Sequence, residues 1–293
     1  MKTHQNKMLL LLFVLGLGIF AVQNVHAQEK NKFDPSGTIH ALTREDGSGT
    51  RQAFADLFDL KDENGIDQTD PHIAVTNATS VMMMTAASDP HAIGFTSLGA
   101  MNDQVRPVAI DNVEASQETI ENGTYSMARP FQLAITKDLS PAGQDFIRFI
   151  LSPQGERVIA DRGYIPTGNS QPYEPAHIKA EIMVSGSSSV APVMEKLKEQ
   201  YETLSPETTV IVQQSDSSSG MRDAIDGTAD IGMASRQLER SELDQGLQAV
   251  QIAKDGIVVI VNPGNPVRSL SAKQVKAIFT DSTLHWNDIE AIR

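Results

Sequence analysis

In three places this sequence passes from a short apolar stretch, through a loop of Gly, Ser and Thr, directly into a helical pattern. The loops span residues 44–50, 185–189 and 215–220. Helical apolar spacing follows each one, as at Ala53, Phe54 and Leu57 after the first loop. Strands that alternate with helices in this way predict an α/β protein with largely parallel sheets.

The same loops have the chemistry of an anion site. A helix start leaves backbone N–H groups unpaired and carries the positive end of the helix dipole. Hydroxyls add donors, glycine permits close approach, and Arg44 offers a charge with a bidentate fork. If the loops converge, they form a cage for a small tetrahedral oxyanion. Serine is also a preferred helix cap, so capping alone is the alternative for any single loop.

Residues 1–27 predict a secretory signal peptide. Lys2 and Lys7 precede an apolar run over 8–22, and residues 25–27 (Val-His-Ala) fit a small-x-small cleavage site. An uncleaved N-terminal anchor is the alternative. The chain has no cysteine, so no thiol can carry a lipid anchor. We therefore expect a free exported protein in the periplasm.

The chain is acidic. It carries 37 Asp and Glu against 24 Lys and Arg, a formal charge of −13. Removing the two signal lysines leaves 22 basic residues, and 22 − 37 gives −15. Nucleic acid and anionic membranes are therefore poor candidate partners. An acidic protein can still bind an anion, because uncharged donors and helix dipoles act at short range.

Further along the chain, strands are expected near residues 39–43, 93–95, 105–110, 182–184, 210–213, 231–234 and 257–261. Helices are expected after the loops, over 81–87, and after Ser140, Ser152 and Ser271 as caps. Residues 166–178 hold three prolines and little periodicity, which is typical of a linker.

Other chemistries find little support. The five histidines beyond the signal show no metal-ligand spacing, and no Walker-type GxxxxGK[ST] loop occurs. Residues 46–49 do not form a G-x-S-x-G nucleophile elbow. We predict no cofactor and no metal.

The chain resembles the periplasmic phosphate-binding proteins of Pst-type ABC transporters, which have a type II periplasmic-binding-protein fold. Residues 44–50, 185–190, 218–220, 229–236, 255–263, 286–289, 92–95, 122–125 and 129–130 carry the resemblance. It implies an α/β fold of two lobes, each a mainly parallel sheet flanked by helices, with a hinge between them.

The order of these motifs departs from the family's. The stretch resembling residues 181–289 comes first there, and the stretch resembling 38–168 follows, so the chain looks circularly permuted. The expected lobe A joins residues 36–129 to 261–293, and lobe B spans 130–260 with the linker 166–178. The two pieces of lobe A must meet without a peptide bond, either within one chain or by a domain swap between two.

The resemblance and the loops give the candidate phosphate ligands, which are Arg44, Gly47, Ser48, Gly49, Thr50, Ser188, Ser189, Val190, Ser218 and Ser219. Where some family members have an aspartate that accepts the proton of hydrogen phosphate, this chain has Arg236. Its side chain is either a second cationic contact or turned outward, so rejection of sulfate is in question.

Together these observations predict an exported protein, not an enzyme, that captures inorganic phosphate between two lobes and delivers it to an inner-membrane ABC permease. A monomer is expected. One alternative is a binder of another tetrahedral oxyanion, such as sulfate or molybdate. Another is an exported phosphatase or hydrolase with a loop serine as nucleophile, and a third is a rearranged relic that no longer serves a transporter.

Overall fold

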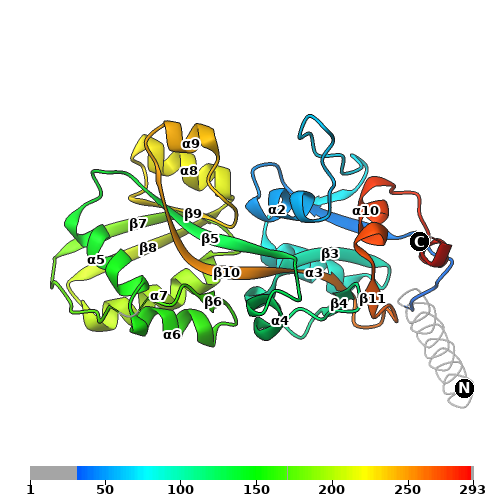
Figure 1. The fold of residues 1–293 in the computed structure, drawn as a ribbon, viewed down its shortest axis with the longest axis horizontal. Coiled ribbons are helices and arrows are strands. Elements are labelled where there is room, and N and C mark those ends of the chain that lie inside the picture. Colours follow the sequence, from blue (N-terminus) through cyan, green and yellow to red (C-terminus); the bar gives the residue numbers. More distant parts are fainter. Residues whose placement is uncertain (1–31, 170, 292–293) are drawn as a thin grey trace, which may run out of the picture.

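The computed structural model describes residues 32–169 and 171–291, and the predicted signal peptide lies outside these residues. Figure 1 shows two lobes side by side, with β5 and β10 passing between them. We call lobe A the part built on β1–β4 and β11, and lobe B the part built on β7–β9. No described helix is long and apolar enough to cross a membrane.

The strands are β1 (His40–Arg44), β2 (Ala74–Thr76), β3 (Ala92–Ser97), β4 (Arg106–Ile110), β5 (Ala128–Ile135), β6 (Ile165–Pro166), β7 (Ala180–Ser187), β8 (Thr208–Ser215), β9 (Ile231–Ala234), β10 (Gln248–Val261) and β11 (Ser269–Leu270). The helices are α2 (Gly49–Leu57), α3 (Thr79–Ser88), α4 (Gln117–Glu121), α5 (Pro141–Ile150), α6 (Pro153–Asp161), α7 (Ala191–Leu204), α8 (Ser217–Asp226), α9 (Arg240–Asp244) and α10 (Ala272–Thr280), with 3-10 turns η1 (Leu98–Ala100) and η2 (Trp286–Ala291).

The strand order β2-β1-β3-β10-β5-β9-β7-β8 runs through both lobes. In lobe A, β2 and β3 flank β1 in parallel, and β10 pairs antiparallel with β3. In lobe B, β8 and β9 flank β7 in parallel, and β5 pairs antiparallel with β9. The two-lobed α/β prediction is confirmed, with an antiparallel strand beside each parallel trio.

Each lobe has its own apolar core. In lobe A, Phe54 stacks on Phe95 with ring centroids 4.0 Å apart, and Phe279 packs edge-on against Phe54. In lobe B, Phe146, Phe149 and Tyr201 pack together. β10 contributes to both, because Ile252 and Ala253 belong to the lobe B core while Ile257, Val259 and Val261 belong to the lobe A core.

The first and last described segments meet in lobe A. Thr38 forms an isolated antiparallel bridge with His285, and the Ile39 N–H donates to the Leu284 carbonyl at 2.8 Å. The Asn287 N–H donates to the Pro35 carbonyl at 2.8 Å. Segments more than 240 positions apart therefore assemble within a single chain (Figure 1).

Several parts of the fold go beyond the expected elements, among them the short elements β2, β6, β11, α4 and α9. β10 begins at Gln248, nine residues before the expected strand over 257–261, and β5 has no counterpart among the expected strands. Pro166 ends β6, and the rest of the predicted linker, 167–178, is irregular in its described residues yet anchored. The Tyr173 hydroxyl donates to the buried Asp145 carboxylate at 2.7 Å.

Candidate functional site: a hydroxyl cluster at four helix starts

The first turns of four helices meet where the two lobes touch. α2 and α3 come from lobe A, and α7 and α8 come from lobe B. Their hydroxyls bond across the boundary. Thr50 lies 2.8 Å from Ser189, and Thr79 lies 3.0 Å from Ser189 and 3.1 Å from Ser188, oxygen to oxygen. We call Thr50, Thr79, Ser188, Ser189, Ser217 and Ser235 the hydroxyl cluster, and all six are buried.

Arg44 supplies the positive charge of this cluster. It stands at the carboxyl end of β1, and its side chain is 2% exposed. Its guanidinium donates to Thr79 at 3.3 Å and to Ser188 at 3.0 Å. The Nε and Nη2 groups of Arg44 also donate to the two carboxylate oxygens of Glu45, each at 2.7 Å. Arg44 therefore spans both lobes, with its charge balanced by the next residue.

The start of α2 reaches lobe B because it carries no side chain at Gly49. A Cβ there would lie 2.4 Å from the Ser217 hydroxyl oxygen and 2.9 Å from that of Ser235. Ser48 caps the helix by accepting from the Arg51 N–H. Gly47 also lies against lobe B. Its carbonyl accepts a hydrogen bond from the Ser218 N–H at 3.2 Å across the lobe boundary. The first loop is thus seated directly against α8.

The second loop folds tightly for a similar reason. Gly186 has a φ of +133°, and a Cβ there would lie 2.4 Å from the Met233 carbonyl oxygen of β9. This turn at the end of β7 directs Ser188 and Ser189 toward lobe A. Val190 is the N-cap of α7, and its N–H donates to the Ser187 carbonyl at 3.0 Å.

The third loop divides its serines among different neighbours. Ser217 faces the cluster, where its oxygen accepts from the Ser235 N–H at 3.2 Å. Ser218 accepts from Arg236 at 3.1 Å. Ser219 turns back and donates to the helix-capping carboxylate of Asp216 at 2.6 Å. The structure therefore brings Ser217 into the cluster, places Ser218 beside it, and directs Ser219 away.

Arg236 is buried but lies outside the hydroxyl cluster. Its guanidinium forms two bonds with Glu242, at 2.9 and 2.7 Å, and one with Ser218. Among the described residues its Nε has no hydrogen-bond partner. The side chain therefore points inward, one layer behind Ser218, and is neutralised within lobe B.

A second buried ion pair supports the cluster where the strands cross between lobes. Arg129 on β5 bonds Asp255 on β10 at 2.9 and 3.0 Å, and it donates to the Ser235 carbonyl at 3.2 Å. Ser97 donates to the other Asp255 oxygen at 2.8 Å. Burial raises the pKa of Asp255 and lowers that of Arg129, while their mutual attraction opposes both changes.

Thr79 and Ser235 are site residues outside the three predicted loops, and Ser217 lies in the third loop but was not among the candidate ligands. Thr79 begins α3 directly after β2, so it too stands at a strand-to-helix junction. Its surroundings, Asn77-Ala78-Thr79-Ser80, contain no glycine and resemble an ordinary cap. The strand-to-helix junction, rather than a loop rich in glycine and serine, was the signal that could have identified Thr79.

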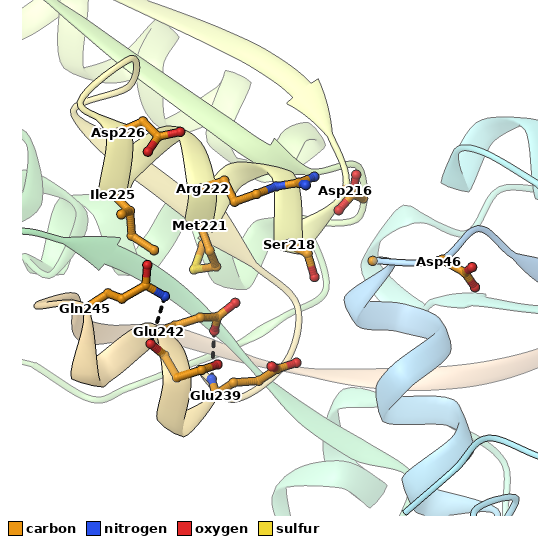
Figure 2. Close-up of a pocket in the computed structure, with 12 residues that line it drawn as sticks. Asp46, Asp216, Ser218, Met221, Arg222, Ile225, Asp226, Glu239, Glu242 and Gln245 are labelled. Carbon is orange, nitrogen blue, oxygen red and sulfur yellow. Dashed lines mark hydrogen bonds between the residues drawn. The ribbon is translucent and has the colours of Figure 1, made fainter.

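A wide hollow opens beside the cluster at Gly47 and Ser218 (Figure 2). Figure 2 shows Asp46 of lobe A on one side and Asp216 and Arg222 of lobe B on the other. Five carboxylates and one arginine line the hollow, namely Asp46, Asp216, Asp226, Glu239, Glu242 and Arg222. That balance disfavours an anion, so the chemistry for anion binding belongs to the buried cluster rather than to the hollow.

Comparison with known proteins places the chain in a family. The family model described as PBP superfamily domain matches residues 18–154 and 171–292. Phosphate-binding protein PstS 2 of Streptococcus agalactiae is 45% identical over 298 residues, which cover 99% of each chain. Phosphate-binding protein PstS of Staphylococcus haemolyticus is 33% identical over 121 residues, covering 39% of this chain and 38% of that one.

A solved structure is similar over most of the chain. It is titled a phosphate ABC transporter, phosphate-binding protein from Streptococcus pneumoniae TIGR4, and it has 36% sequence identity and a TM-score of 0.69. The match covers 86% of this chain and all of that one. With the full-length family match and the end-to-end relative, this shows that the chain belongs to the PBP superfamily and, within it, to the PstS family.

Proposed function

We propose that this protein captures inorganic phosphate between its two lobes and delivers it to an ABC permease. The observation that carries the proposal is the meeting of four helix starts with a buried arginine and six buried hydroxyls. Helix starts and hydroxyls supply donors to all sides of a tetrahedral anion, and the arginine supplies charge. The relatives' names, phosphate-binding protein PstS, agree with this ligand.

The proposed ligands are the predicted ones without Ser219, which turns back to Asp216, plus Thr79, Ser217 and Ser235. Hydroxyl hydrogens rotate freely, so Thr50, Thr79, Ser188 and Ser189 can turn from one another toward an anion's oxygens. Buried donors left without an acceptor are costly, and a ligand with four acceptor oxygens satisfies them together. Specificity then depends on whether an anion provides an acceptor for each buried donor, and not on its charge alone.

Lobe closure is the second part of the proposal. The described chain passes between the lobes on β5 and β10. On β5, Met127 belongs to the lobe A core and Phe131 to the lobe B core, and on β10, Ala253 belongs to the lobe B core and Ile257 to the lobe A core. We place the hinge in these stretches, which keeps 36–129 in lobe A and moves the start of its second piece from 261 to about 257. Closed lobes would signal occupancy to the permease.

Export and a permuted order complete the proposal. The apolar N-terminus fits a signal peptide, and the mature protein then works outside the membrane, in the periplasm, without a lipid anchor. The Staphylococcus haemolyticus relative aligns over only 39% of this chain, as expected when the order of two halves differs and only one can align at a time. Lobe A closes within one chain, which favours a monomer over a domain swap.

We also propose that the protein binds phosphate without turnover. A loop serine acting as nucleophile needs a base within hydrogen-bond reach. In the described part of the chain, the Ser48 oxygen accepts from the Arg51 N–H and bonds no histidine. Turnover of a chromogenic phosphate ester that Ser48→Ala abolishes would contradict this assignment.

The direct test is calorimetric titration of phosphate into the purified, phosphate-stripped protein, followed by sulfate and molybdate as competitors. One-to-one binding that sulfate does not displace supports phosphate capture. Displacement by sulfate identifies a general oxyanion binder, and a folded protein that binds neither anion overturns the proposal. Arg222→Ala is a matched control, because Arg222 lines the acidic hollow but has no contact with the hydroxyl cluster.

A further inference from the structure

Two histidines and a carboxylate gather at the end of lobe A away from the hydroxyl cluster. His40 is the first residue of β1, whereas Arg44 is its last, so about 13 Å of strand separates them. Asp89 and His91 lie in the turn between α3 and β3. Parallel pairing of β1 with β3 sets His40 opposite Ala92, which brings His91 beside it. One ligand atom from each of the three lies within 4.8 Å of the others.

Backbone groups hold two of these side chains in place. One Asp89 oxygen accepts from the His91 N–H at 2.9 Å, and the other lies 2.6 Å from His40 Nδ1. His91 Nε2 lies 3.1 Å from the Asp34 carbonyl oxygen and 3.0 Å from the Asp34 nitrogen. The Asp34 N–H donates to Nε2 in the tautomer with the proton on Nδ1, whereas in the other tautomer Nε2–H donates to the carbonyl and Nδ1 carries the lone pair that a metal needs. Metal-binding histidines are oriented by such backbone contacts.

We propose that His40, Asp89 and His91 bind a divalent transition-metal ion, with zinc the best match. Two imidazoles and a carboxylate form a nitrogen and oxygen donor set that suits Zn²⁺, with a fourth position for water. Tetrahedral ligands about 2.0–2.1 Å from Zn²⁺ lie roughly 3.3 Å apart. The wider ligand distances have to contract, and the 2.6 Å contact of His40 Nδ1 with Asp89 has to lengthen. His40 can make this adjustment because its side chain is 52% exposed.

The ion would join three segments that are distant in sequence. Phe33 packs on His91 with ring centroids 5.6 Å apart and on Trp286 at 5.8 Å. The Trp286 ring N–H donates to the His91 carbonyl at 3.3 Å. A metal on His91 would therefore strengthen the contact of residues 33–34 and 286 with the β1–β3 edge. Its effect is on the stability of lobe A, not on the anion site.

The chain offers matched controls for this site. His72 pairs with Asp70, His177 with Glu207 and His285 with Asp288. Each pair has one histidine and one carboxylate, and none joins the groups of three found among the described residues. His72→Ala therefore removes an exposed histidine–carboxylate pair without touching the proposed ligands.

The test is calorimetric titration of ZnCl₂ into tag-free, metal-stripped protein, with thermal unfolding followed in parallel. We expect one ion per chain, a higher melting temperature with zinc, and reversal by EDTA, because a ligand that binds only the folded state stabilises it. His40→Ala should weaken binding at least tenfold and abolish the thermal shift, while His72→Ala should bind as the unaltered protein does.

Asp89→Asn provides a second variant, since it removes the charge but keeps an acceptor for the His91 N–H. It should also weaken zinc binding while the metal-free protein melts normally. Zinc binding that survives both His40→Ala and Asp89→Asn overturns the proposal, as does the absence of binding at 100-micromolar zinc or an equal loss in His72→Ala. Phosphate titration is unaffected in every case, so the result is independent of the anion site.

Discussion

The two lobes bring different chemistry to the same site, although both place a buried arginine beside it. In lobe A, Arg44 donates directly to the hydroxyl cluster and is balanced by Glu45, whose side chain is 21% exposed. In lobe B, Arg236 is held behind Ser218 by Glu242, whose side chain is 10% exposed. Lobe A thus supplies the charge that reaches the site, and lobe B supplies mostly hydroxyls.

This difference shows why neither lobe suffices alone. Ser188 meets the Arg44 cation, and Ser189 the Thr50 hydroxyl, only across the lobe boundary. An anion that contacts both lobes would bind more tightly than one that contacts a single lobe, and it would hold the lobes together. The following variants separate the shared framework, the charge, the hydroxyls and the acid response of the two lobes.

The largest effect is expected in the framework that both lobes share. Arg129→Ala leaves Asp255 as a buried charge without its partner, which costs about 3–5 kcal/mol of unfolding free energy. Urea unfolding measures the change. Lys276→Ala, which breaks the exposed pair with Asp59, is the control and should cost less than about 1 kcal/mol. Equal losses in the two variants would show that the Arg129 pair is not special.

Next comes the charge from lobe A. Arg44→Ala should weaken phosphate binding by about 2–5 kcal/mol, because it removes a buried charged donor and leaves Glu45 unpaired. Calorimetry provides the value, and circular dichroism checks folding. Unchanged affinity in a folded variant would mean that the assigned site is wrong.

The arginine of lobe B should matter less. Replacing the whole pair, Arg236→Met with Glu242→Gln, removes both charges and avoids a lone buried carboxylate. We expect phosphate affinity to fall by less than about 1.4 kcal/mol, or tenfold. A loss as large as that of Arg44→Ala would show that both lobes supply charge, and a changed ratio of phosphate to sulfate affinity would identify Arg236 as a selectivity residue.

Single hydroxyls should have effects of a similar, modest size. Thr79→Val in lobe A and Ser189→Ala in lobe B should each weaken phosphate binding by about 0.5–1.5 kcal/mol. The two oxygens are 3.0 Å apart, so the double variant should deviate from additivity by at least about 0.5 kcal/mol. Strict additivity would indicate that the two hydroxyls do not share a ligand.

Acid should loosen lobe A first. Hydrogen bonds from His72 and Ser282 hold the pKa of Asp70 well below its usual range, and those from Thr69 and Arg51 lower the pKa of Asp67 despite its burial. A lowered carboxyl pKa adds stability above the unfolded value, near 3.9, that is lost as pH falls below it.

The single tryptophan, Trp286, reports on lobe A alone. Its fluorescence should change below about pH 4 before the far-ultraviolet dichroism of the whole chain does. Asp70→Asn should flatten that early phase. Coincident transitions in the unaltered protein would show that the lobes respond to acid as one unit.

Local sequence patterns predicted the elements of this molecule that are determined by neighbouring residues. β9 has the bounds that were expected, and helices follow the Gly, Ser and Thr loops, although α2 and α8 begin inside the predicted loops, at Gly49 and Ser217. β5 and the first half of β10 were not predicted. In β10, Gln251, Lys254 and Asp255 interrupt the apolar pattern. Their pairing is set by a partner strand more than 100 residues away.

The site shows the same division. Glycine and serine in the loops indicated Arg44, Thr50, Ser188 and Ser189, which the structure brings together. Thr79 joins them only because β2 lies beside β1, and Ser217 rather than Ser219 faces inward because of the phase of α8. His40 and His91 are 51 positions apart, so strand register alone makes them neighbours.

The meeting of residues 35–39 with 284–287 has a consequence for how the chain comes to be folded. Most of lobe B is contiguous, so its core can form while later residues are still being synthesised. Lobe A needs strand β10, helix α10 and η2, which come last, so its earlier residues have to wait almost until the chain is complete. Chaperones that hold unfolded chains would therefore find their binding sites in the first hundred residues rather than in the middle.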